Sequence, residues 1–367
     1  MIRQMLKILL LAAGVVCALP VTAAQTPAQK LLKRLIKLQK KGVMVGHQDD
    51  PVYGTTWSWD ENRSDVLEAA GDYPAVMGFD LGEIELGHDK NLDKVPFDRI
   101  RKEAVAQYQR GGIVTLSWHP HNPVTGANAW DPTEQPVRKI LEGGETGKKF
   151  TQWLKTVAEY IKSIKTPDGK QVPIIFRPWH EMNGGWFWWG KGSCTPEEYK
   201  KLYRLTRKTI EEDGLKGYIV WSWSPNLDGK DDTAEKFMMR YPGDDCVDMM
   251  GIDIYEFDNN DQNYSETTKA ELKVLTSCAR EHKKIAAFTE TGCRGVGNKT
   301  TWFTDIILPI LREYKGQLSY VLFWRNDYLN PDKEAYLPGK GSKAIPDFRK
   351  FKEQKDILFL NDIIKNK

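Results

Sequence analysis

The sequence is poor in cysteine, and its cysteines form no metal-binding pattern. Of the 5 cysteines among 367 residues, four lie beyond the N-terminal segment: Cys194, Cys246, Cys278 and Cys293. Their spacing matches no zinc motif. They can form up to two disulfides, in three possible pairings, or remain buried thiols, because a chain of this length builds a core that needs no cross-link.

The sequence also lacks an excess of charge, an internal repeat and a linker. The formal net charge is +3, from 53 basic and 50 acidic residues, and no basic stripe is present, which argues against a nucleic-acid partner. No low-complexity tract or Pro/Ser/Thr-rich segment divides the chain, and no apolar stretch is long enough to span a bilayer. We therefore expect one globular domain, monomeric and without a transmembrane segment.

The N-terminus has the pattern of a targeting segment. Two basic residues precede an apolar run, Ile8–Leu19, and small residues follow it at Val21–Ala23. This pattern predicts a signal peptide over residues 1–23 and a mature domain over 24–367, exported to the periplasm or the medium. A lipid anchor on Cys17 is the alternative, and it is less favoured because a valine precedes this cysteine where a small residue is usual.

Short apolar runs alternate with amphipathic stretches along the rest of the chain. The runs are Val43–Gly46, Ala75–Phe79, Ile113–Leu116, Val172–Phe176, Tyr218–Val220, Val247–Ile252, Ile285–Phe288 and Tyr320–Phe323. Helical spacing of apolar residues occurs in Thr26–Lys40, Phe97–Arg110, Lys149–Lys165, Pro196–Glu212, Thr268–His282 and Trp302–Tyr314. Eight strand–helix units predict the α/β class, as a single-domain (β/α)8 TIM barrel.

Two glutamates at the ends of predicted strands are the candidates for catalysis. Glu181 follows the fourth apolar run and Glu290 follows the seventh. Because the carboxyl ends of parallel barrel strands share one face, we expect these side chains to meet. For either glutamate alone, a structural role in a salt bridge is as good an interpretation as a catalytic role. Two on one face with tryptophans around them favour glycoside hydrolysis, which uses a pair of carboxylates.

The surroundings of the two glutamates predict different roles. Tryptophans crowd Glu181, and an apolar pocket raises a carboxyl pKa, as a general acid requires. Glu290 is expected to be the ionised nucleophile, with a hydrogen bond from Tyr255 and with Arg325 lowering its pKa. We expect the two carboxyl groups to lie about 5–5.5 Å apart, the separation of a retaining double displacement.

The chain is rich in tryptophan, with 13 in all. Eleven of them lie at predicted strand ends or in the loops that follow: Trp57, Trp59, Trp118, Trp130, Trp179, Trp186, Trp188, Trp189, Trp221, Trp223 and Trp324. Flat aromatic faces suit pyranose rings, whereas core packing is the alternative use of tryptophan. We expect roughly half of the eleven to contact sugar.

Three histidines raise the alternative of a metallohydrolase. His119 and His121 have a spacing that can bind zinc, and His180 precedes Glu181. A third ligand would have to come from Asp80 or Asp253, and no helical zinc motif is present. We therefore expect no metal and no cofactor, and histidines that donate to sugar hydroxyls.

At this point two motifs resemble a known family. Arg177-Pro178-Trp179-His180-Glu181-Met182-Asn183-Gly184, continuing to Trp186–Trp189, resembles the acid/base motif of glycoside hydrolase family 26, and Phe288–Gly292 resembles its nucleophile motif. The resemblance implies a retaining barrel with Glu181 as acid/base and Glu290 as nucleophile. It also implies these substrate-binding residues: His119, Trp130, His180, Trp186, Asp253, Tyr255, Trp324 and Arg325.

The resemblance implies a substrate class as well. The family's dominant activity is β-1,4-mannanase, so we expect hydrolysis of mannan, glucomannan or galactomannan, with endo action favoured. A β-1,3-xylanase or a mixed-linkage β-glucanase on the same scaffold is the first alternative. A non-catalytic carbohydrate-binding barrel is the second, and the presence of both glutamates argues against it.

Overall fold

The computed structural model describes residues 24–226 and 233–364. The predicted signal peptide and Cys17 lie outside these ranges. Among the described residues, no helix combines the length and apolar character needed to cross a membrane.

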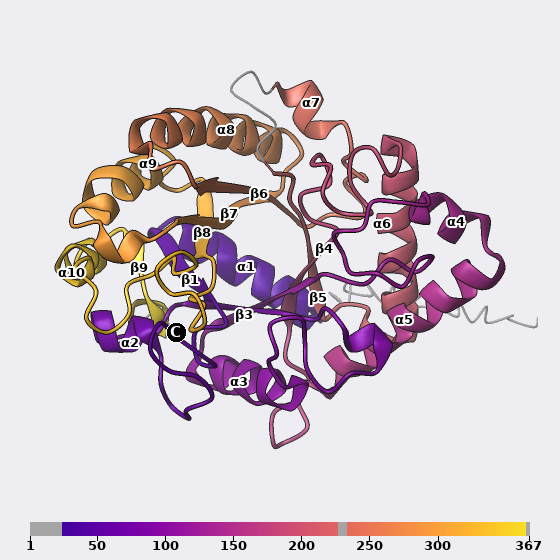
Figure 1. Ribbon diagram of the computed structural model, residues 1–367, viewed down its shortest axis with the longest axis horizontal. Coiled ribbons are helices and arrows are strands. Elements are labelled where there is room, and N and C mark those ends of the chain that lie inside the picture. The colour runs from indigo at the N-terminus through magenta and orange to yellow at the C-terminus, as the bar shows by residue number, and fades with distance from the viewer. Residues whose placement is uncertain (1–23, 227–232, 365–367) are drawn as a thin grey trace, which may run out of the picture.

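Eight parallel strands close into a barrel (Figure 1). They are β1 (Val43–Gln48), β2 (Val76–Asp80), β3 (Ile113–Trp118), β4 (Ile174–Pro178), β5 (Ile219–Trp223), β6 (Met249–Glu256), β7 (Ile285–Cys293) and β8 (Leu318–Phe323). Each strand pairs with the next, and β1 pairs with both β2 and β8. The prediction of a (β/α)8 barrel is thus confirmed. A short strand, β9 (Ile357–Leu358), is added outside β1.

Helices surround the barrel, most of them between successive strands and two of them after β8 (Figure 1). They are α2 (Asp65–Ala70), α3 (Phe97–Arg110), α4 (Pro136–Glu142), α5 (Gly144–Ser163), α6 (Pro196–Ile210), α7 (Ala234–Met238), α8 (Asp261–Glu281), α9 (Leu308–Glu313), α10 (Ile345–Lys352) and α11 (Leu360–Ile364). The predicted range of α3 agrees with the structure, whereas α5 and α8 begin earlier than predicted. Single π-helical turns extend α6 at Glu211–Leu215 and precede α9 at Phe303–Ile307.

The first helix, α1 (Pro27–Gln39), covers the amino-terminal end of the barrel. Thr26 caps it through a reciprocal pair of hydrogen bonds with Gln29, and its proline stands in the first turn, where the missing N–H is not needed. Leu31 and Leu35 are buried in one apolar cluster with the inward side chains of the strands. Figure 1 shows α1 in indigo, lying across the barrel.

The barrel interior changes from apolar to polar along its axis. Near α1, inward side chains such as Met44, Val76 and Ile175 form a fully buried layer. Asp80 lies two inward positions after Val76 on β2, and Arg177 lies one inward position after Ile175 on β4. Both are buried and form ion pairs, Asp80 with His119 and Arg177 with Asp253. The interior therefore supports a packed floor below a polar mouth, as expected for active sites at the carboxyl end of such barrels.

No disulfide joins any two of the four cysteines in the described ranges, and all four are buried. Both tryptophans of β5 face the helices: Trp221 contacts Tyr203 of α6, and Trp223 contacts Phe237 of α7. Their outward direction turns the serines between and after them toward the interior.

Candidate active site

A pocket of about 600 Å³ opens at the carboxyl ends of the strands. Its volume falls in the range of small-molecule sites. It is lined by His119, Trp130, His180, Glu181, Trp186, Phe187, Asn226, Tyr255, Phe257, Glu290, Arg294, Trp324, Glu334 and Tyr336. Both candidate glutamates are thus in one cavity, although 109 residues separate them in the chain.

A β-bulge aims Glu290 into this pocket. The pairing of β6 with β7 shifts there, so that Ile252 pairs with Phe288 and Asp253 pairs with Glu290, which leaves Thr289 as the extra residue. The hydroxyl of Thr289 donates to the Ile252 carbonyl (3.0 Å) and to the Asp253 carboxylate (2.6 Å). Bulges of this kind redirect side chains next to active sites. Glu290 therefore lies inside β7, three residues before its end, and not at the end as predicted.

Arg177 and Tyr255 hold the carboxylate of Glu290. The guanidinium of Arg177 donates to Oε1, and the hydroxyl of Tyr255 donates to Oε2 at 2.7 Å. Arg177 also donates to Asp253 at 2.9 Å and to Ser224 at 3.1 Å. Burial raises the pKa of Tyr255, and the charge of Glu290 raises it further, so the phenol remains a donor.

The guanidinium of Arg177, buried below the pocket, forms ion pairs with two carboxylates, Asp253 and Glu290. Burial alone lowers the pKa of Arg177, but the charges of Asp253 and Glu290 outweigh it and raise the pKa above its ordinary value. Burial raises the pKa of Asp253 despite the opposing charge of Arg177. Asp253 is fully buried and does not line the pocket. Its place below Glu290 makes it a support for Arg177 and not a wall of the cavity.

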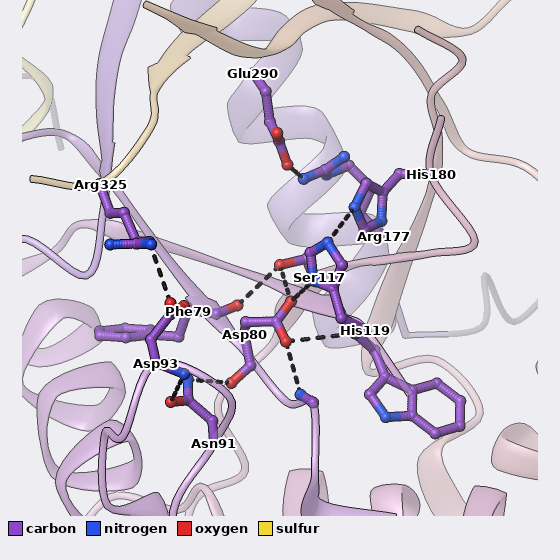
Figure 2. Close-up of polar contacts among 12 residues, drawn as sticks. Phe79, Asp80, Asn91, Asp93, Ser117, His119, Arg177, His180, Glu290 and Arg325 are labelled. Carbon is purple, nitrogen blue, oxygen red and sulfur yellow. Dashed lines mark hydrogen bonds and ion pairs between the residues drawn. The ribbon is translucent and has the colours of Figure 1, made fainter. Parts of the chain in front are cut away.

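Arg325 does not have the position that we expected. It pairs with Asp93 at 3.2 Å and with Asp327 at 3.5 Å, and it is absent from the pocket lining (Figure 2). The guanidinium beside Glu290 belongs to Arg177. The expectation that Arg325 acts on the charge of Glu290 is corrected accordingly: β4 supplies that cation, and the loop after β8 does not.

Glu181 is held in a strained turn directly after β4. Both Trp179 (φ 58°) and Glu181 (φ 55°) adopt the left-handed conformation, which costs energy for residues other than glycine. The backbone N–H of Glu181 donates to the Ser224 carbonyl at 2.8 Å, which fixes the turn against β5. Strain of this kind persists at functional sites because the surrounding structure imposes it.

Two neutral donors contact the Glu181 carboxyl group. Asn226 donates to Oε1 at 2.7 Å and Trp186 donates to Oε2 at 2.8 Å. Asn226 is itself held by Asn183, since its backbone N–H donates to the Asn183 side chain at 2.8 Å. Burial raises the pKa of Glu181 to about 7, with the negative charge of Glu290 as the next cause. A carboxyl group with this pKa is protonated in about half of the molecules at pH 7 and can donate its proton near neutral pH.

The two glutamates are close to one another. One carboxylate oxygen from each of Glu181, Asp253 and Glu290 lies within 4.8 Å of the others. Their environments differ, because Glu290 contacts a cation, whereas the hydrogen-bond donors to Glu181 among the described residues are neutral. Environments that separate the charge states of two neighbouring carboxyl groups mark an acid and a nucleophile.

A hydrogen-bonded histidine pair stands beside Glu290 (Figure 2). The Nε2 atoms of His119 and His180 are 2.9 Å apart, and His119 Nδ1 lies 2.7 Å from Asp80. Burial lowers the pKa of His119, but the charge of Asp80 outweighs it, so that the net direction is upward. Burial lowers the pKa of His180 well below its usual value, and the charges of Arg177 and His119 lower it further.

These directions assign the protons of the pair. A protonated His119 donates to the Nε2 of a neutral His180, whose proton then resides on Nδ1. That Nδ1 atom is buried and has no hydrogen-bond partner among the described residues, and the His180 side chain lines the pocket. His121 bonds instead to the Gly126 carbonyl at 3.0 Å. The His119–His121 spacing therefore does not converge on one point, as a zinc site requires.

Six of the eight predicted substrate-binding residues line the pocket: His119, Trp130, His180, Trp186, Tyr255 and Trp324. Of the eleven tryptophans, Trp130, Trp186 and Trp324 line the pocket. This number is smaller than the roughly half that we expected to contact sugar. Trp118, Trp179, Trp188, Trp189, Trp221 and Trp223 are fully buried and pack in the core. Trp130 is 47% exposed, and its ring stacks on the His119 ring with 5.4 Å between the centroids. An exposed aromatic ring held in this way suits contact with a ligand.

Sequence reasoning missed several residues of the site. Arg177 stands in the quoted motif, and strand alternation with Ile175 places it inward, so a signal for it was present. The others occupy loops with no periodicity to read: Asn226, Phe187, Phe257, Arg294, Glu334 and Tyr336.

The raised pKa of Glu181 predicts a measurable effect on stability. Its ordinary pKa is 4.5, so between about pH 4.5 and 7 the folded protein holds a proton that the unfolded chain releases. The free energy of unfolding therefore falls as pH rises through this window. In Glu181→Gln this loss is absent, and the variant gains up to about 3 kcal/mol relative to wild type between pH 4.5 and 8. Urea denaturation at both pH values measures the difference.

The control for this prediction is Glu145→Gln, because Glu145 is exposed on α5. Its free energy of unfolding should follow that of wild type at both pH values. Parallel pH dependence of Glu181→Gln and wild type would show that Glu181 has no raised pKa.

Comparison with known proteins finds relatives of this chain among carbohydrate-active enzymes. The family model described as glycosyl hydrolase family 26 matches residues 21–306. A mannan endo-1,4-beta-mannosidase of Bifidobacterium adolescentis is 33% identical over 325 residues, covering 82% of this chain and 32% of the relative. A mannan endo-1,4-beta-mannosidase of Thermothelomyces thermophilus is 25% identical over 323 residues, 84% of this chain and 57% of the relative. The chain thus spans about a third to a little over half of these two relatives.

A solved structure shows the same architecture over nearly the whole chain. A GH26 beta-mannanase from Bacteroides ovatus superposes with a TM-score of 0.87 and 41% sequence identity, covering 92% of this chain and 96% of that chain.

Proposed function

The chain belongs to glycosyl hydrolase family 26, and we propose that it is an exported, endo-acting mannanase that cleaves β-1,4-mannosidic bonds with retention. Mannan, glucomannan and galactomannan are its proposed substrates. The observation that carries the proposal is that carboxylate oxygens of Glu181 and Glu290 lie within 4.8 Å of each other. Glu290 contacts the Arg177 guanidinium, whereas Glu181 has a pKa of about 7. The mannanases among its relatives support the choice of mannose.

The geometry supports a double displacement. Glu290 attacks the anomeric carbon and forms a glycosyl–enzyme ester while Glu181 protonates the leaving oxygen. Glu181, now ionised, then removes a proton from water, which displaces Glu290 and regenerates both groups. Arg177 and Tyr255 hold the Glu290 carboxylate in position for attack through their hydrogen bonds to its two oxygens.

The predicted substrate-binding residues have the following roles in this proposal. The Nδ1 of His180 donates to a hydroxyl of the sugar at Glu290, and His119 and Trp130 lie beside it. Trp324 supports the ring of that sugar, and Trp186 contacts the leaving sugar while it donates to Glu181. Asp253 acts from below through Arg177. Arg325 is proposed to contact a sugar further along the glycone side, from its ion pair with Asp93.

Activity on three polysaccharides tests this function. Purified protein is incubated with linear mannan, mixed-linkage β-glucan and β-1,3-xylan, and reducing ends and product sizes are followed over time. We expect fast release from mannan with early products of mixed size, and a first product of unchanged anomeric configuration by NMR. Preferential release from glucan or xylan would replace the substrate, an inverted anomer would reject retention, and binding without release would identify a carbohydrate-binding barrel.

A further inference from the structure

Five side chains form a closed ring of contacts on one side of the pocket. We call Tyr255, Phe257, Arg294, Glu334 and Tyr336 the β6–β8 wall, because Tyr255 lies at the end of β6 and the other four follow β6, β7 or β8. Tyr255 stacks on Phe257 (5.1 Å between centroids), and the Arg294 guanidinium lies 4.4 Å from the centroid of Phe257. Arg294 pairs with Glu334 at 3.2 Å, Tyr336 donates to Glu334 at 2.9 Å, and Tyr336 contacts the edge of Tyr255.

The backbone makes room for this wall and anchors it. A Cβ atom on Gly292 would lie 2.3 Å from the Tyr336 ring, so glycine is needed at this position of β7. The N–H of Tyr336 donates to the side chain of Asn326 at 2.9 Å, and Asn326 in turn donates to the buried Asp65 at 2.8 Å. The wall is therefore preorganised by buried hydrogen bonds and not by its own exposed pair.

The charged members of the wall remain accessible to a ligand. The side chains of Arg294 and Glu334 are 43% and 27% exposed, and both line the pocket. An exposed ion pair contributes little to stability, about 0–1 kcal/mol. A guanidinium with five N–H donors beside a carboxylate acceptor is, by contrast, well suited to adjacent sugar hydroxyl groups.

The chemistry of the two sides of the pocket orients the sugar at Glu290. The histidine pair follows β3 and β4, which lie across the barrel from β7 and β8. In a pyranose, the anomeric carbon has two ring neighbours: C2, which carries a hydroxyl, and the ring oxygen, which has no proton and leads to C5 and C6. The donor on His180 suits the hydroxyl-bearing side. The β6–β8 wall is then on the side of the ring oxygen and C5, with C6 toward Arg294 and Glu334.

A second pocket lies behind the β8 loop, next to this wall. It has a volume of about 270 Å³ and is lined by Gly295, Asp332, Ala335, Leu337 and neighbouring residues of the β1 and β8 loops. Along the β8 loop, alternate residues face the two pockets: Glu334 and Tyr336 line the catalytic pocket, whereas Ala335 and Leu337 line the second. The two pockets therefore lie on opposite faces of the β8 loop, and Glu334 is on the face of the catalytic pocket.

We propose that Arg294 and Glu334 bind an α-linked hexosyl branch on the 6-hydroxyl of the mannose that occupies the Glu290 position. The inference rests on the proposed function, which it extends from the main chain of the substrate to its side branches. Cleavage at a branched mannose in this position leaves the branch on the reducing-end residue of the product. Determining the structure of the product therefore shows whether a branched mannose occupied the Glu290 position.

The test compares linear β-1,4-manno-oligosaccharides with the same oligosaccharides carrying single α-1,6-galactosyl branches. For wild type we expect products with galactose on the reducing-end mannose. In Arg294→Ala, kcat/KM on the branched substrate should fall by about 10-fold or more, because a charged hydrogen-bond partner is lost. On linear substrate the change should remain below about 3-fold. Glu334→Gln, which keeps an acceptor, should give a smaller loss of the same kind.

The matched control is Arg204→Ala, because Arg204 forms an exposed ion pair with Asp245 outside the pocket. It should leave both substrates unaffected. Equal losses on linear and branched substrate in Arg294→Ala would show that the wall only positions Tyr255, and would overturn the proposal. A wild type that never leaves galactose at a reducing end overturns it as well, while its cleavage of linear mannan keeps the proposed function. A wild type inactive on linear mannan would reject both.

Discussion

Glu290→Ala is expected to lower kcat on linear mannan by about 10⁴-fold or more, because it removes the atom that forms the covalent bond. The remaining site still binds sugar and still holds Glu181, so KM should change far less than kcat. The fold should survive, because Arg177 keeps Asp253 as a partner at 2.9 Å. Release of reducing ends by pure protein measures the loss, and circular dichroism checks the fold.

A small anion distinguishes a nucleophile from a structural carboxylate. In Glu290→Ala the vacated space admits azide, which attacks the anomeric carbon from the same face when the leaving group needs no acid. The expected product is an α-glycosyl azide, with activity partly restored. Glu145→Ala, a carboxylate exposed on α5, serves as the control and should act like wild type. Substantial activity of Glu290→Ala without azide would mean that another carboxylate is the nucleophile.

The barrel was predictable because its signals are local and repeated. Each strand is an apolar run, and each run is followed by an amphipathic segment, so errors at single boundaries do not change the count of units. The convergence of Glu181 and Glu290 followed from the parallel direction of the strands alone. No knowledge of side-chain packing was required to bring two residues over a hundred positions apart into one pocket.

The details of the site were less predictable, because they depend on which way a side chain points. Trp188 and Trp189 look equal in the sequence to Trp186, yet both are fully buried, whereas Trp186 is 39% exposed. Arg325 stands directly after Trp324, and alternation turns it away from Glu290 toward Asp93. The bulge at Thr289 is invisible in a sequence because it is a mismatch between two strands. Loop residues such as Arg294 and Glu334 carry no periodic pattern at all.

The histidine pair shows the same limit at the level of protons. A His-x-His spacing predicts ligands for zinc as readily as donors for sugar. The bond of His121 to the Gly126 carbonyl separates the two histidines of this motif. Asp80 on β2 fixes the proton of His119 and thereby the acceptor role of His180 Nε2 (Figure 2). A group on a different strand thus decides the chemistry of the motif.

Arg177→Met is expected to affect both stability and catalysis strongly. Its guanidinium is the shared cation of two buried carboxylates, Asp253 and Glu290, and its removal leaves both without compensation. Breaking such a cluster costs about 3–5 kcal/mol in the free energy of unfolding. Loss of a charged donor at the nucleophile should also lower kcat by about 10²–10³-fold. Urea denaturation and steady-state kinetics on mannan measure the two effects.

A second substitution separates the buried charge from the shape of the side chain. If uncompensated charge is the cause, Asp253→Asn in the Arg177→Met background should restore part of the stability, so that the two changes are not additive. Arg177→Lys keeps the cation but not the two-pronged geometry, and should retain more stability than activity. Arg204→Met removes an exposed pair and should cost less than about 1 kcal/mol. Additive losses in the double variant would mean that Arg177 stabilises the barrel by packing, and that its charge does not hold Glu290 ready for attack.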